Sequence, residues 1–396
     1  MRVPRSLRRF GAPVLALLVA ACGGSTGATT PTSTADKADV KVGLIYCKTG
    51  ALAAYGTEYI DGFNLGLNYA TKGTGKINGH KIVVNVNDDA GDPAKAVSIA
   101  KDLIGQGYKI IGGSCSSGVA LQLAPLAAQN QVLFLSGAAA TDGLTGINKY
   151  TFRSGRQSIQ DVITAKAMLG AVDGKKVLVF AQDSAFGQGN VAAVKSVFTG
   201  ATVSSLLVPP TASDFTTFAK QAKDSKSDLI YVAWAGTTAQ AMFQTLDQQG
   251  VLSSTTVVTG LAEKATWGTF GSAGSKLSLI SLYFQDAATN DVNKQLIAAT
   301  KKEGTFPDLF TPDGFVTAQL LVHAIDKADG DQSVDKLISA LEGYTFAAPK
   351  GQETVRAGDH AMLQPMFVAK LVQNGSDYQA QLVKTLSPTD TAPPQK

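Results

Sequence analysis

The sequence predicts an α/β protein with two lobes, each built on an open, mostly parallel sheet. From residue 40 onward, short apolar segments alternate with segments of helical periodicity, which is the pattern of parallel βαβ units. The alternation restarts after residue 156. The body of roughly 350 residues is also long enough to form two domains.

The first half contains four expected strands and three expected helices in alternation. The strands are residues 40–47, 80–88, 109–113 and 132–137, and the helices are residues 55–70, 93–107 and 120–130. Pro93 stands in the first turn of its helix, where the missing N–H costs nothing.

The second half repeats this order and then continues. Helices are expected at residues 161–172, 190–198, 214–223 and 239–249, and strands at residues 175–183, 202–209, 227–236 and 255–260. An apolar segment at 276–284, helices at 312–328 and 334–343 and a strand at 364–372 follow. This long ending indicates that the chain crosses back between the lobes. Because ligands bind beyond the carboxyl ends of parallel strands, two such lobes facing each other predict a binding cleft that closes like a hinge.

The chain begins with an expected export signal over residues 1–21, where basic residues precede an apolar core of about a dozen residues and then small residues. Val19-Ala20-Ala21-Cys22 resembles a lipobox, which implies that Cys22 is lipidated; an ordinary signal peptide cut nearby is the alternative. Residues 22–39 then form a flexible tether to the membrane, and residues 387–396 a disordered tail.

The positive formal charge belongs to this leader. The whole chain has 35 Lys+Arg and 31 Asp+Glu, a formal net charge of +4. Four arginines and no acid lie in residues 1–21, so the rest of the chain carries 31 of each sign. A neutral surface argues against nucleic-acid binding.

Several kinds of chemistry are excluded by residues that are missing. His80, His323 and His360 have no partners at metal-ligand spacing, so we expect no metal. His360 with Asp359 is interpreted as a structural or hinge contact. No G-x-S-x-G nucleophile elbow stands at the end of an expected strand and there is no dinucleotide fingerprint, so we expect no enzyme and no cofactor.

The segment 112–125, "GGSCSSGVALQLAP", predicts a tight loop between a strand and a helix. It has the glycine spacing of a phosphate loop, but Val119 and Ala120 stand where Lys and Ser/Thr are required. Ser116 and Ser117 lie at the expected helix N-terminus, where free N–H groups and the helix dipole favour a bound carboxylate. Simple helix capping by the serines is the alternative.

A second loop of the same kind favours the binding interpretation. "VLFLSGAAATDGLT" also follows a buried strand, so the two loops are expected at one edge of the sheet. The same rim supplies Tyr55, and the second lobe offers Phe186 and Trp234. This combination suits a small organic anion with an apolar part.

Over nearly its whole length the chain resembles the type I periplasmic binding proteins of ABC importers. The segments that carry the resemblance include "TGALAAYG", "IIGGSCSSG", "YTFRSGRQS", "VFAQDSAFGQG" and "SDLIYVAWAG", in this order. The subgroup that binds leucine, isoleucine and valine is the most similar. The resemblance implies two Rossmann-like lobes joined by three crossovers, with a ligand sealed between them.

The resemblance also implies which residues hold the ligand. Its carboxylate would be held by Ser116 with Ser117 and by the turn Ala139-Ala140-Thr141. Tyr55 would pack on the ligand from the first lobe, and Phe186 stands where the family usually has Tyr.

Two departures from the family leave the ligand class open. The acid that holds the ammonium of amino acids is expected just after "VVTG", but Glu263 comes about two positions late in our alignment. A tyrosine expected in "VAWAGTT" is replaced, with Trp234 close by. An aromatic or aliphatic carboxylate without an amine, or a small amide, is therefore the alternative to a branched-chain amino acid.

The cysteines predict a disulfide. Exported proteins live where thiols oxidise, and Cys47 and Cys115 remain once Cys22 is lipidated. Cys47 ends the first strand and Cys115 follows the third, and these strands are neighbours in a doubly wound sheet of order 2-1-3-4. Two buried thiols are the alternative.

These observations predict a solute-binding lipoprotein, anchored by lipid at the outer face of the cell membrane or periplasmic, monomeric, that delivers its ligand to an ABC permease. The alternative is a sensory ligand-binding module. We expect the first lobe to comprise residues 40–156 and 284–345, and the second lobe residues 157–283 and 346–386.

Overall fold

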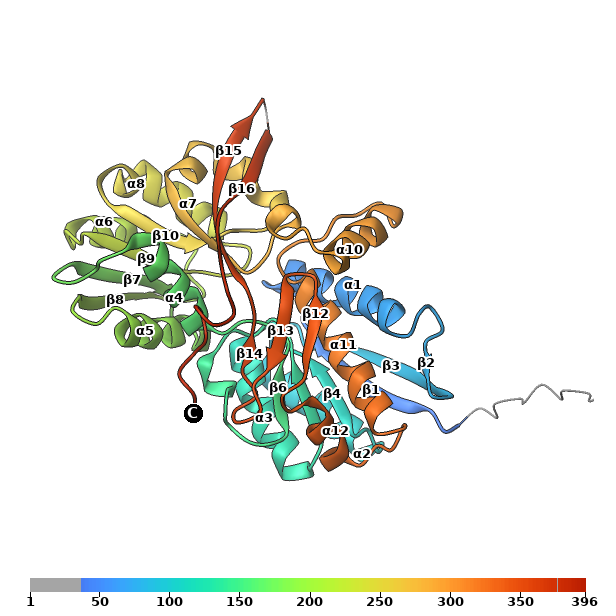
Figure 1. Ribbon diagram of the computed structural model, residues 1–396. Helices are drawn as coiled ribbons and strands as arrows, with labels where there is room; N and C mark the ends of the chain where they lie inside the picture. The colour runs from blue at the N-terminus through green and yellow to red at the C-terminus, as the bar shows by residue number, and fades with distance from the viewer. Residues whose placement is uncertain (1–36, 376) are drawn as a thin grey trace, which may run out of the picture. The chain divides into compact units, whose positions relative to one another are not determined.

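The computed structural model describes residues 37–396 apart from residue 376, and it contains two α/β lobes (Figure 1). The export signal expected over residues 1–21, Cys22 and the tether up to residue 36 lie outside the described residues. In the part of the chain that the structure describes, no helix is both long and apolar enough to span a membrane.

The first lobe is built on a six-stranded sheet in the order β2-β3-β1-β4-β5-β6, parallel except for β2. Its strands are β1 (Val40–Tyr46), β2 (Lys76–Ile77), β3 (His80–Asp88), β4 (Ile110–Gly113), β5 (Leu133–Ser136) and β6 (Thr151–Arg153). The core on one face comes from α1 (Ala53–Ala70), α11 (Thr311–Lys327) and α12 (Val334–Leu341), and on the other from α2 (Pro93–Gly105) and α3 (Ser117–Asn130). Because both faces are covered, β4 and β5 are apolar and buried throughout.

The second lobe is built on a seven-stranded sheet in the order β16-β15-β11-β10-β9-β7-β8. Its strands are β7 (Lys176–Gln182), β8 (Thr202–Val208), β9 (Leu229–Ala233), β10 (Thr256–Gly260), β11 (Leu277–Ser281), β15 (Met366–Asn374) and β16 (Asp377–Leu386). The last two form an antiparallel hairpin on β11. The core lies against α4 (Ser158–Leu169) and α5 (Ala185–Val197) on one face, and α6 (Thr216–Asp224), α7 (Ala239–Gln248) and α8 (Val251–Ser254) on the other.

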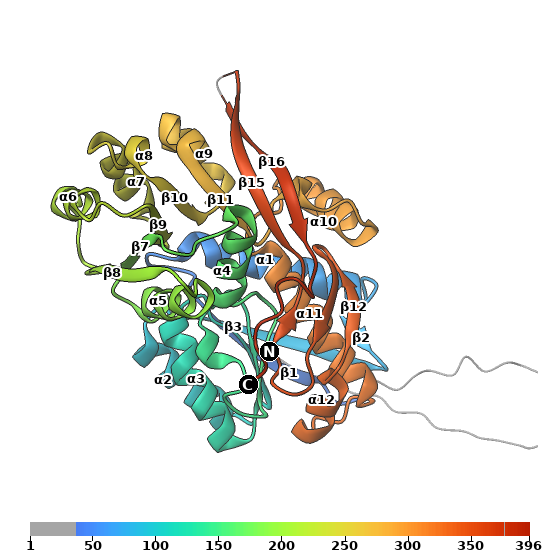
Figure 2. The same cartoon turned by 60° about the vertical axis from the view of Figure 1, so that its left-hand side comes forward.

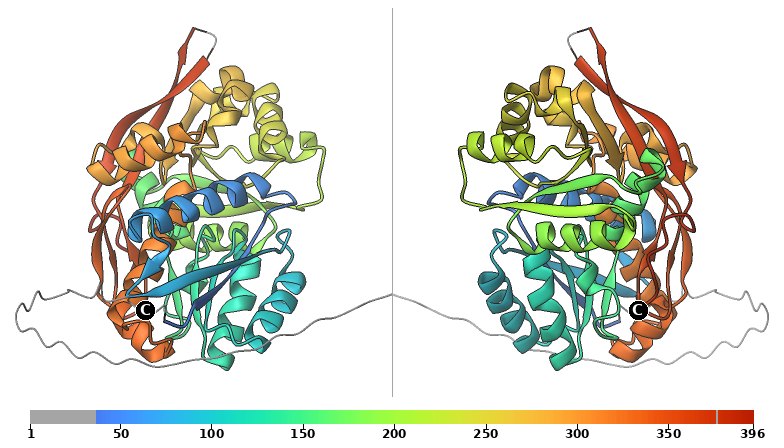
Figure 3. Two further views of the ribbon diagram at one scale, coloured as in Figure 1. Left: turned by 90° about the vertical axis from the view of Figure 1, so that its right-hand side faces the viewer. Right: turned by 90° about the vertical axis from the view of Figure 1, so that its left-hand side faces the viewer.

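The chain passes between the lobes three times, as predicted. It crosses from β6 to α4, then from β11 to α10 (Asp291–Lys302), whose apolar side packs on α1 and α11. The third crossing leads from β14 (Met362–Leu363) into β15. Figure 3 shows these last segments, coloured orange to red, running along one side of both lobes. Short elements complete the chain: η1 (Asp142–Leu144), η2 (Lys264–Thr266), α9 (Trp267–Phe270), η3 (Gly271–Lys276) and η4 (Gln285–Ala287).

The expected boundary of the second lobe at residue 346 is corrected by the structure. Here β12 (Thr345–Ala348) and β13 (Gly351–Val355) join β14 in a small antiparallel sheet. Phe346 and Ala348 alternate with exposed residues and are buried in the core of the first lobe, together with Val355. The third crossing therefore comes after residue 363, because one face of β12 needs the apolar surface of α11 and α12.

The expected disordered tail, residues 387–396, is also corrected, because it packs back on the first lobe (Figure 2). Thr391 is fully buried, and its hydroxyl donates to the carbonyl of Gln364 at 3.2 Å. The Arg356 guanidinium donates to the carbonyl of Pro393 at 2.7 Å, and the N–H of Lys396 donates to Asp359 at 3.2 Å. A polar, proline-rich composition suggested disorder, but the carbonyls of this segment serve as acceptors for the partly buried Arg356.

A fully buried group of charges lies beside the third crossing. Lys350 is 3.2 Å from Asp313 and 3.8 Å from Glu353, and it also donates to the amide of Gln364. Burial raises the pKa of Glu353 to about 7. Asp313 lies at the start of α11 and Glu353 in β13, so the ion pairs of Lys350 join these two elements.

We predict that removing residues 387–396 destabilises the protein. The deletion takes acceptors from Arg356 and opens the site of the buried Thr391, and hydrogen bonds to charged groups contribute ~1.5–3 kcal/mol each. The free energy of unfolding, measured by chemical denaturation, should therefore fall by about 2–4 kcal/mol.

A milder pair of variants tests the same point. Thr391→Val should lower the free energy of unfolding by about 1 kcal/mol, whereas the same change at the exposed Thr389 should have little effect. Equal denaturation midpoints for the full chain and the truncated chain would contradict a packed tail.

Candidate ligand-binding site

A partly open cavity of about 330 Å³ lies between the two lobes. It is bounded by the loops that follow β1, β4 and β5 in the first lobe and β7, β9 and β10 in the second. These are the carboxyl ends of parallel strands, where the topology of both sheets leaves room for a ligand.

Most of the residues predicted for the site line this cavity. Those that do are Tyr55, Ser116, Ser117, Ala140, Phe186, Trp234 and Glu263. Ala139 and Thr141 are buried and do not line it, whereas their neighbour Ala138 does. Glu263, which the alignment placed late, thus reaches the cavity.

The loop before α3, residues 113–118, brings Ser116 and Ser117 to the cavity wall. Gly113 has φ +115°, and a Cβ there would meet the Ile45 carbonyl at 2.1 Å, so only glycine permits this tight turn. Ser116 is the N-cap residue of α3, yet its side chain makes no capping hydrogen bond. By contrast, Asp92 caps α2 by accepting from two N–H groups. The Ser116 hydroxyl is therefore not needed for capping and is left for a ligand.

The loop after β5, which we call the alanine loop (residues 138–141), is held by arginines. Arg153 donates to the carbonyls of Ala139 and Thr141 at 2.8 and 3.1 Å, and Arg156 donates to that of Ala138 at 3.3 Å. The carbonyl of Ala140 accepts from Ser158. Among the described residues none accepts a hydrogen bond from the Ala140 N–H, which makes it a donor available at the cavity.

Aromatic and apolar side chains form much of the remaining wall. Tyr55 packs on Phe310 with ring centroids 4.5 Å apart, and both line the cavity. From the second lobe, Trp234 packs against Phe180 and Phe215, and its indole N–H donates to Thr238. The Trp234 N–H is thus satisfied within its own lobe, and its ring offers mainly an apolar surface.

The rims of the two lobes touch across the mouth of the cavity. The Gly236 N–H donates to the Tyr55 hydroxyl at 3.2 Å, and the Thr237 N–H donates to the Ala51 carbonyl at 3.3 Å. A third contact joins the Lys264 N–H to the Asp308 carboxylate at 2.7 Å. These contacts narrow the opening of the cavity between the lobes.

Three acidic side chains lie near this rim, and burial raises the pKa of each. The pKa of Asp308 rises to about 6, with Glu263 adding to the effect. The pKa of Glu58 rises well above its ordinary value because of burial and then Asp308. For Glu263, burial raises the pKa, and the adjacent Tyr55 hydroxyl partly offsets the rise by hydrogen bonding. A cationic group placed beside Glu263 would favour its charged form.

An ion pair also lies in the wall. Nε of Arg156 is 3.4 and 3.3 Å from the two carboxylate oxygens of Asp161, and both side chains line the cavity. Arg156 belongs to the first crossing and Asp161 to the first turn of α4.

A family model described as "Periplasmic binding protein" matches residues 39–376. The chain belongs to the periplasmic binding protein family.

Curated relatives agree with this assignment. A Leu/Ile/Val-binding protein of Rhizobium johnstonii is 26% identical over 314 residues, covering 77% of this chain and 84% of that protein. A Leu/Ile/Val-binding protein homolog of Brucella melitensis is 25% identical over 309 residues, covering 77% and 83%.

Solved structures are also similar to this chain, both in sequence and in fold. A crystal structure of an ABC-type branched-chain amino acid transporter protein from Rhodopseudomonas palustris shares 33% identity with a TM-score of 0.73, covering 89% of this chain and 98% of that chain. A solute-binding protein of an ABC transporter from another strain of R. palustris, in complex with 3,4-dihydroxybenzoic acid, shares 26% identity with a TM-score of 0.77 and the same coverage. This is a family of solute-binding proteins rather than enzymes, and membership implies a place outside the cytoplasm.

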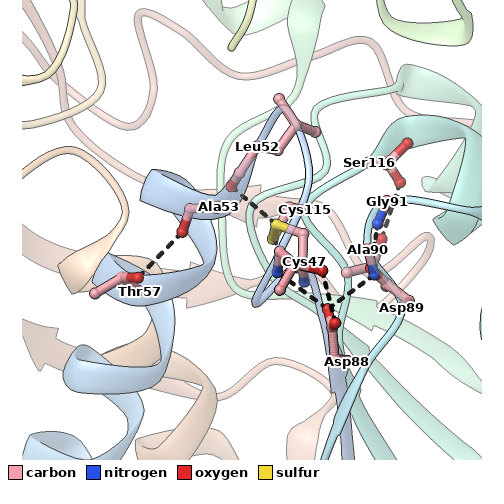
Figure 4. Close-up of a disulfide and its surroundings, with 12 residues drawn as sticks. Cys47, Leu52, Ala53, Thr57, Asp88, Asp89, Ala90, Gly91, Cys115 and Ser116 are labelled. Atoms are coloured by element: carbon pink, nitrogen blue, oxygen red, sulfur yellow. Dashed lines mark hydrogen bonds between the residues drawn. A yellow bond between two sulfur atoms is a disulfide. The ribbon is translucent and has the colours of Figure 1, made fainter. Parts of the chain in front are cut away.

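In this periplasmic binding protein the predicted disulfide between Cys47 and Cys115 is present. It joins the loop after β1 to the loop before α3, next to Ser116 (Figure 4). Cys115 itself lines the cavity, and the bridge spans 68 residues of sequence. The disulfide therefore ties two loops of the site to each other.

Among the residues of the wall that sequence reasoning missed, four bear on the argument: Leu309, Phe310, Arg156 and Asp161. Leu309 and Phe310 come from a segment far along the chain that packs back beside Tyr55. Arg156 lay within a segment quoted for the family resemblance, and Asp161 within an expected helix. The signal that was available is the pair of arginines, Arg153 and Arg156, in one short segment at the point where the alternation of strands and helices restarts.

We predict that Cys47→Ala combined with Cys115→Ala lowers the free energy of unfolding by about 4 kcal/mol. A bridge that closes a loop of this length restricts the unfolded chain by roughly that amount. Chemical denaturation of the variant and of the wild type with and without reductant measures the effect. A wild type whose stability is unchanged by full reduction would contradict the prediction.

Proposed function

We propose that this protein captures a small carboxylate with an apolar body in the cavity between its lobes and delivers it to an ABC permease. The observation that carries the proposal is the cavity itself, with hydrogen-bond donors on one wall and aromatic side chains on the others. A volume of about 330 Å³ is at the small end of ligand cavities and suits a metabolite rather than a peptide.

The carboxylate end of the ligand belongs at the first lobe. Ser116 has a hydroxyl not used for capping, Ser117 is beside it, and the first turn of α3 adds free N–H groups and a favourable dipole. Ala140 supplies a further N–H from the neighbouring loop. Ala139 and Thr141 support this loop from behind, since their carbonyls bind Arg153.

Two ligand classes fit the remainder of the cavity. Glu263 offers a partner for the ammonium of a branched-chain amino acid, as the names of the curated relatives suggest. The rings of Tyr55, Phe186, Trp234 and Phe310 suit an aromatic carboxylate, as in the similar solute-binding protein with bound 3,4-dihydroxybenzoic acid.

The proposed function also includes a location at the membrane and a permease as partner. A lipid on Cys22 and a tether up to residue 39 would hold the monomeric body at the outer face of the membrane. The closed form, with its rims in contact, would dock on the permease. The protein needs no cofactor and no metal for this work.

We predict that a thermal-shift screen identifies a small carboxylate as ligand. A ligand that binds only the folded protein adds about 2.7 kcal/mol of stability at one hundred times its Kd. The panel contains leucine, isoleucine, valine, benzoate, hydroxybenzoates, aliphatic acids and small amides. If no carboxylate raises the melting temperature, the proposed function is wrong.

The proposed role of the Ser116 hydroxyl can be tested against a matched control. Ser116→Ala should weaken the ligand found in the screen by roughly 10–100-fold, because a hydrogen bond to a charged group is lost. Ser333 is also an N-cap residue without a side-chain capping bond, but it lies outside the cavity. Ser333→Ala should leave affinity unchanged, and equal losses in both variants would remove Ser116 from the site.

We predict that proton exchange on binding distinguishes the two ligand classes. The pKa of Glu263 is raised in the closed cavity, and an ammonium beside it would lower this pKa. An amino acid should therefore release protons on binding and bind more tightly as the pH rises through that raised pKa. A carboxylate without an amine should release none.

Calorimetry in two buffers of different ionisation enthalpy measures the proton number. Glu263→Gln should abolish the release and weaken an amino acid by more than tenfold, while a simple carboxylate keeps its affinity within a factor of about three. Proton release that survives Glu263→Gln would place the titrating group elsewhere.

A further inference from the structure

The ion pair in the cavity wall differs from an ordinary structural pair. The side chains of Arg156 and Asp161 are only 9% and 11% exposed. Charges removed from water are costly unless their hydrogen-bonding capacity is used. This pair nevertheless borders the cavity instead of being enclosed by packed side chains.

The neighbouring arginine shows what a purely structural guanidinium looks like here. Arg153 is 1% exposed and makes five hydrogen bonds, through all three of its nitrogens. Arg156 uses Nε for Asp161 and Nη1 for the carbonyl of Ala138. Within the described part of the chain its Nη2 donates to nothing. A guanidinium carries five N–H donors, so Arg156 keeps donors for a group that enters the cavity.

The pair is held firmly in place. The Arg156 guanidinium lies 5.8 Å from the ring centroid of Phe310, and the Arg156 carbonyl accepts from Arg153 at 2.8 Å. Asp161 is fixed in the first turn of α4. Nearby, the neutral Tyr231 and Asn190 line the cavity and bond to each other at 3.4 Å. These four side chains, which we call the polar patch, are therefore preorganised for a ligand group.

The charge of the patch selects the kind of group. Arg156 and Asp161 cancel, so a carboxylate placed there would meet Asp161 and an ammonium would meet Arg156. A hydroxyl group both accepts and donates a hydrogen bond, so it satisfies both partners at once. We propose that Arg156 and Asp161 form a specificity subsite that binds a hydroxyl group of the ligand, separate from the wall that holds its carboxylate.

This inference rests on the proposed function and narrows the ligand class. The ligand is then a hydroxylated carboxylate, either a hydroxy-substituted aromatic acid or an amino acid with a hydroxyl. Sites built to hydrogen-bond a ligand hydroxyl reject analogues without it, because buried polar groups are then left unpaired. A preference of at least tenfold is expected from a charge-assisted bond.

Matched ligand pairs test the subsite by calorimetry. Benzoate is compared with 2-, 3- and 4-hydroxybenzoate, and valine with threonine, its hydroxyl isostere. In the wild type, one hydroxylated member should bind at least tenfold more tightly than its parent. In Asp161→Asn the patch becomes positive, so this preference should fall at least threefold while the parent keeps its affinity within threefold.

The change of charge gives a second readout that loss of packing would not produce. Asp161→Asn should improve binding of the benzene dicarboxylate whose second carboxylate occupies the preferred hydroxyl position. Arg156→Lys keeps the charge but loses the planar donors, and it should also reduce the hydroxyl preference. If Asp161→Asn does not fold, Arg156→Lys supplies the same measurement, which is the affinity for the hydroxylated ligand relative to its parent. Asp142→Asn is the matched control, since Asp142 bonds to the same crossing outside the cavity.

The outcomes separate the two proposals. In one outcome, carboxylates bind the wild type with no preference for a hydroxylated member; in another, they bind with a preference that persists in both variants. Either result would show that the proposed subsite is wrong, while the proposed carboxylate site at Ser116, Ser117 and Ala140 would stand. If no carboxylate in the panel binds the wild type, the proposed function fails and the subsite fails with it.

Discussion

One buried guanidinium holds the point at which the chain first crosses between the lobes. Arg153 donates to carbonyls on both sides of that crossing, from the alanine loop and from Gly155 and Arg156. Burial lowers its pKa to about 10, so it stays charged under ordinary conditions. Because an unpaired buried charge is costly, the loop and the crossing are fixed together. The position of the Ala140 N–H at the cavity depends on this side chain together with Arg156 and Ser158.

Closure of the cleft depends on much weaker forces. Among the described residues, backbone N–H groups donate three hydrogen bonds between the rims. The two with neutral acceptors contribute only ~0.5–1.5 kcal/mol net each, and the one to the Asp308 carboxylate ~1.5–3 kcal/mol. Gly236 permits the approach, since a Cβ there would meet the Ala51 carbonyl at 2.6 Å. A ligand that contacts both lobes adds to the small net free energy of these rim contacts and shifts the population toward the closed form. The firm first crossing and the weak rim together are what a hinged binding protein requires.

The fold and much of the site followed from local patterns, and what was missed depends on long-range packing. Alternating apolar and helical segments predicted both sheets, and strand adjacency predicted the Cys47–Cys115 bridge. The placement of β12 beside α11, the packed tail on Arg356 and the position of Phe310 all join segments far apart in sequence. Composition cannot report such contacts. Arg156 was visible in the sequence, but only its unused donors distinguish it from the saturated Arg153.

The charges of the cavity explain how one site can serve two ligand classes. Arg156 and Asp161 cancel, which leaves Glu263 as the acid whose charge is not balanced in the wall. Burial raises the pKa of Glu263, and an ammonium placed beside it would lower that pKa and pair with the carboxylate. In the proposed function, Glu263 is therefore the group whose protonation differs between a bound amino acid and a bound acid without an amine, and the aromatic walls need not change.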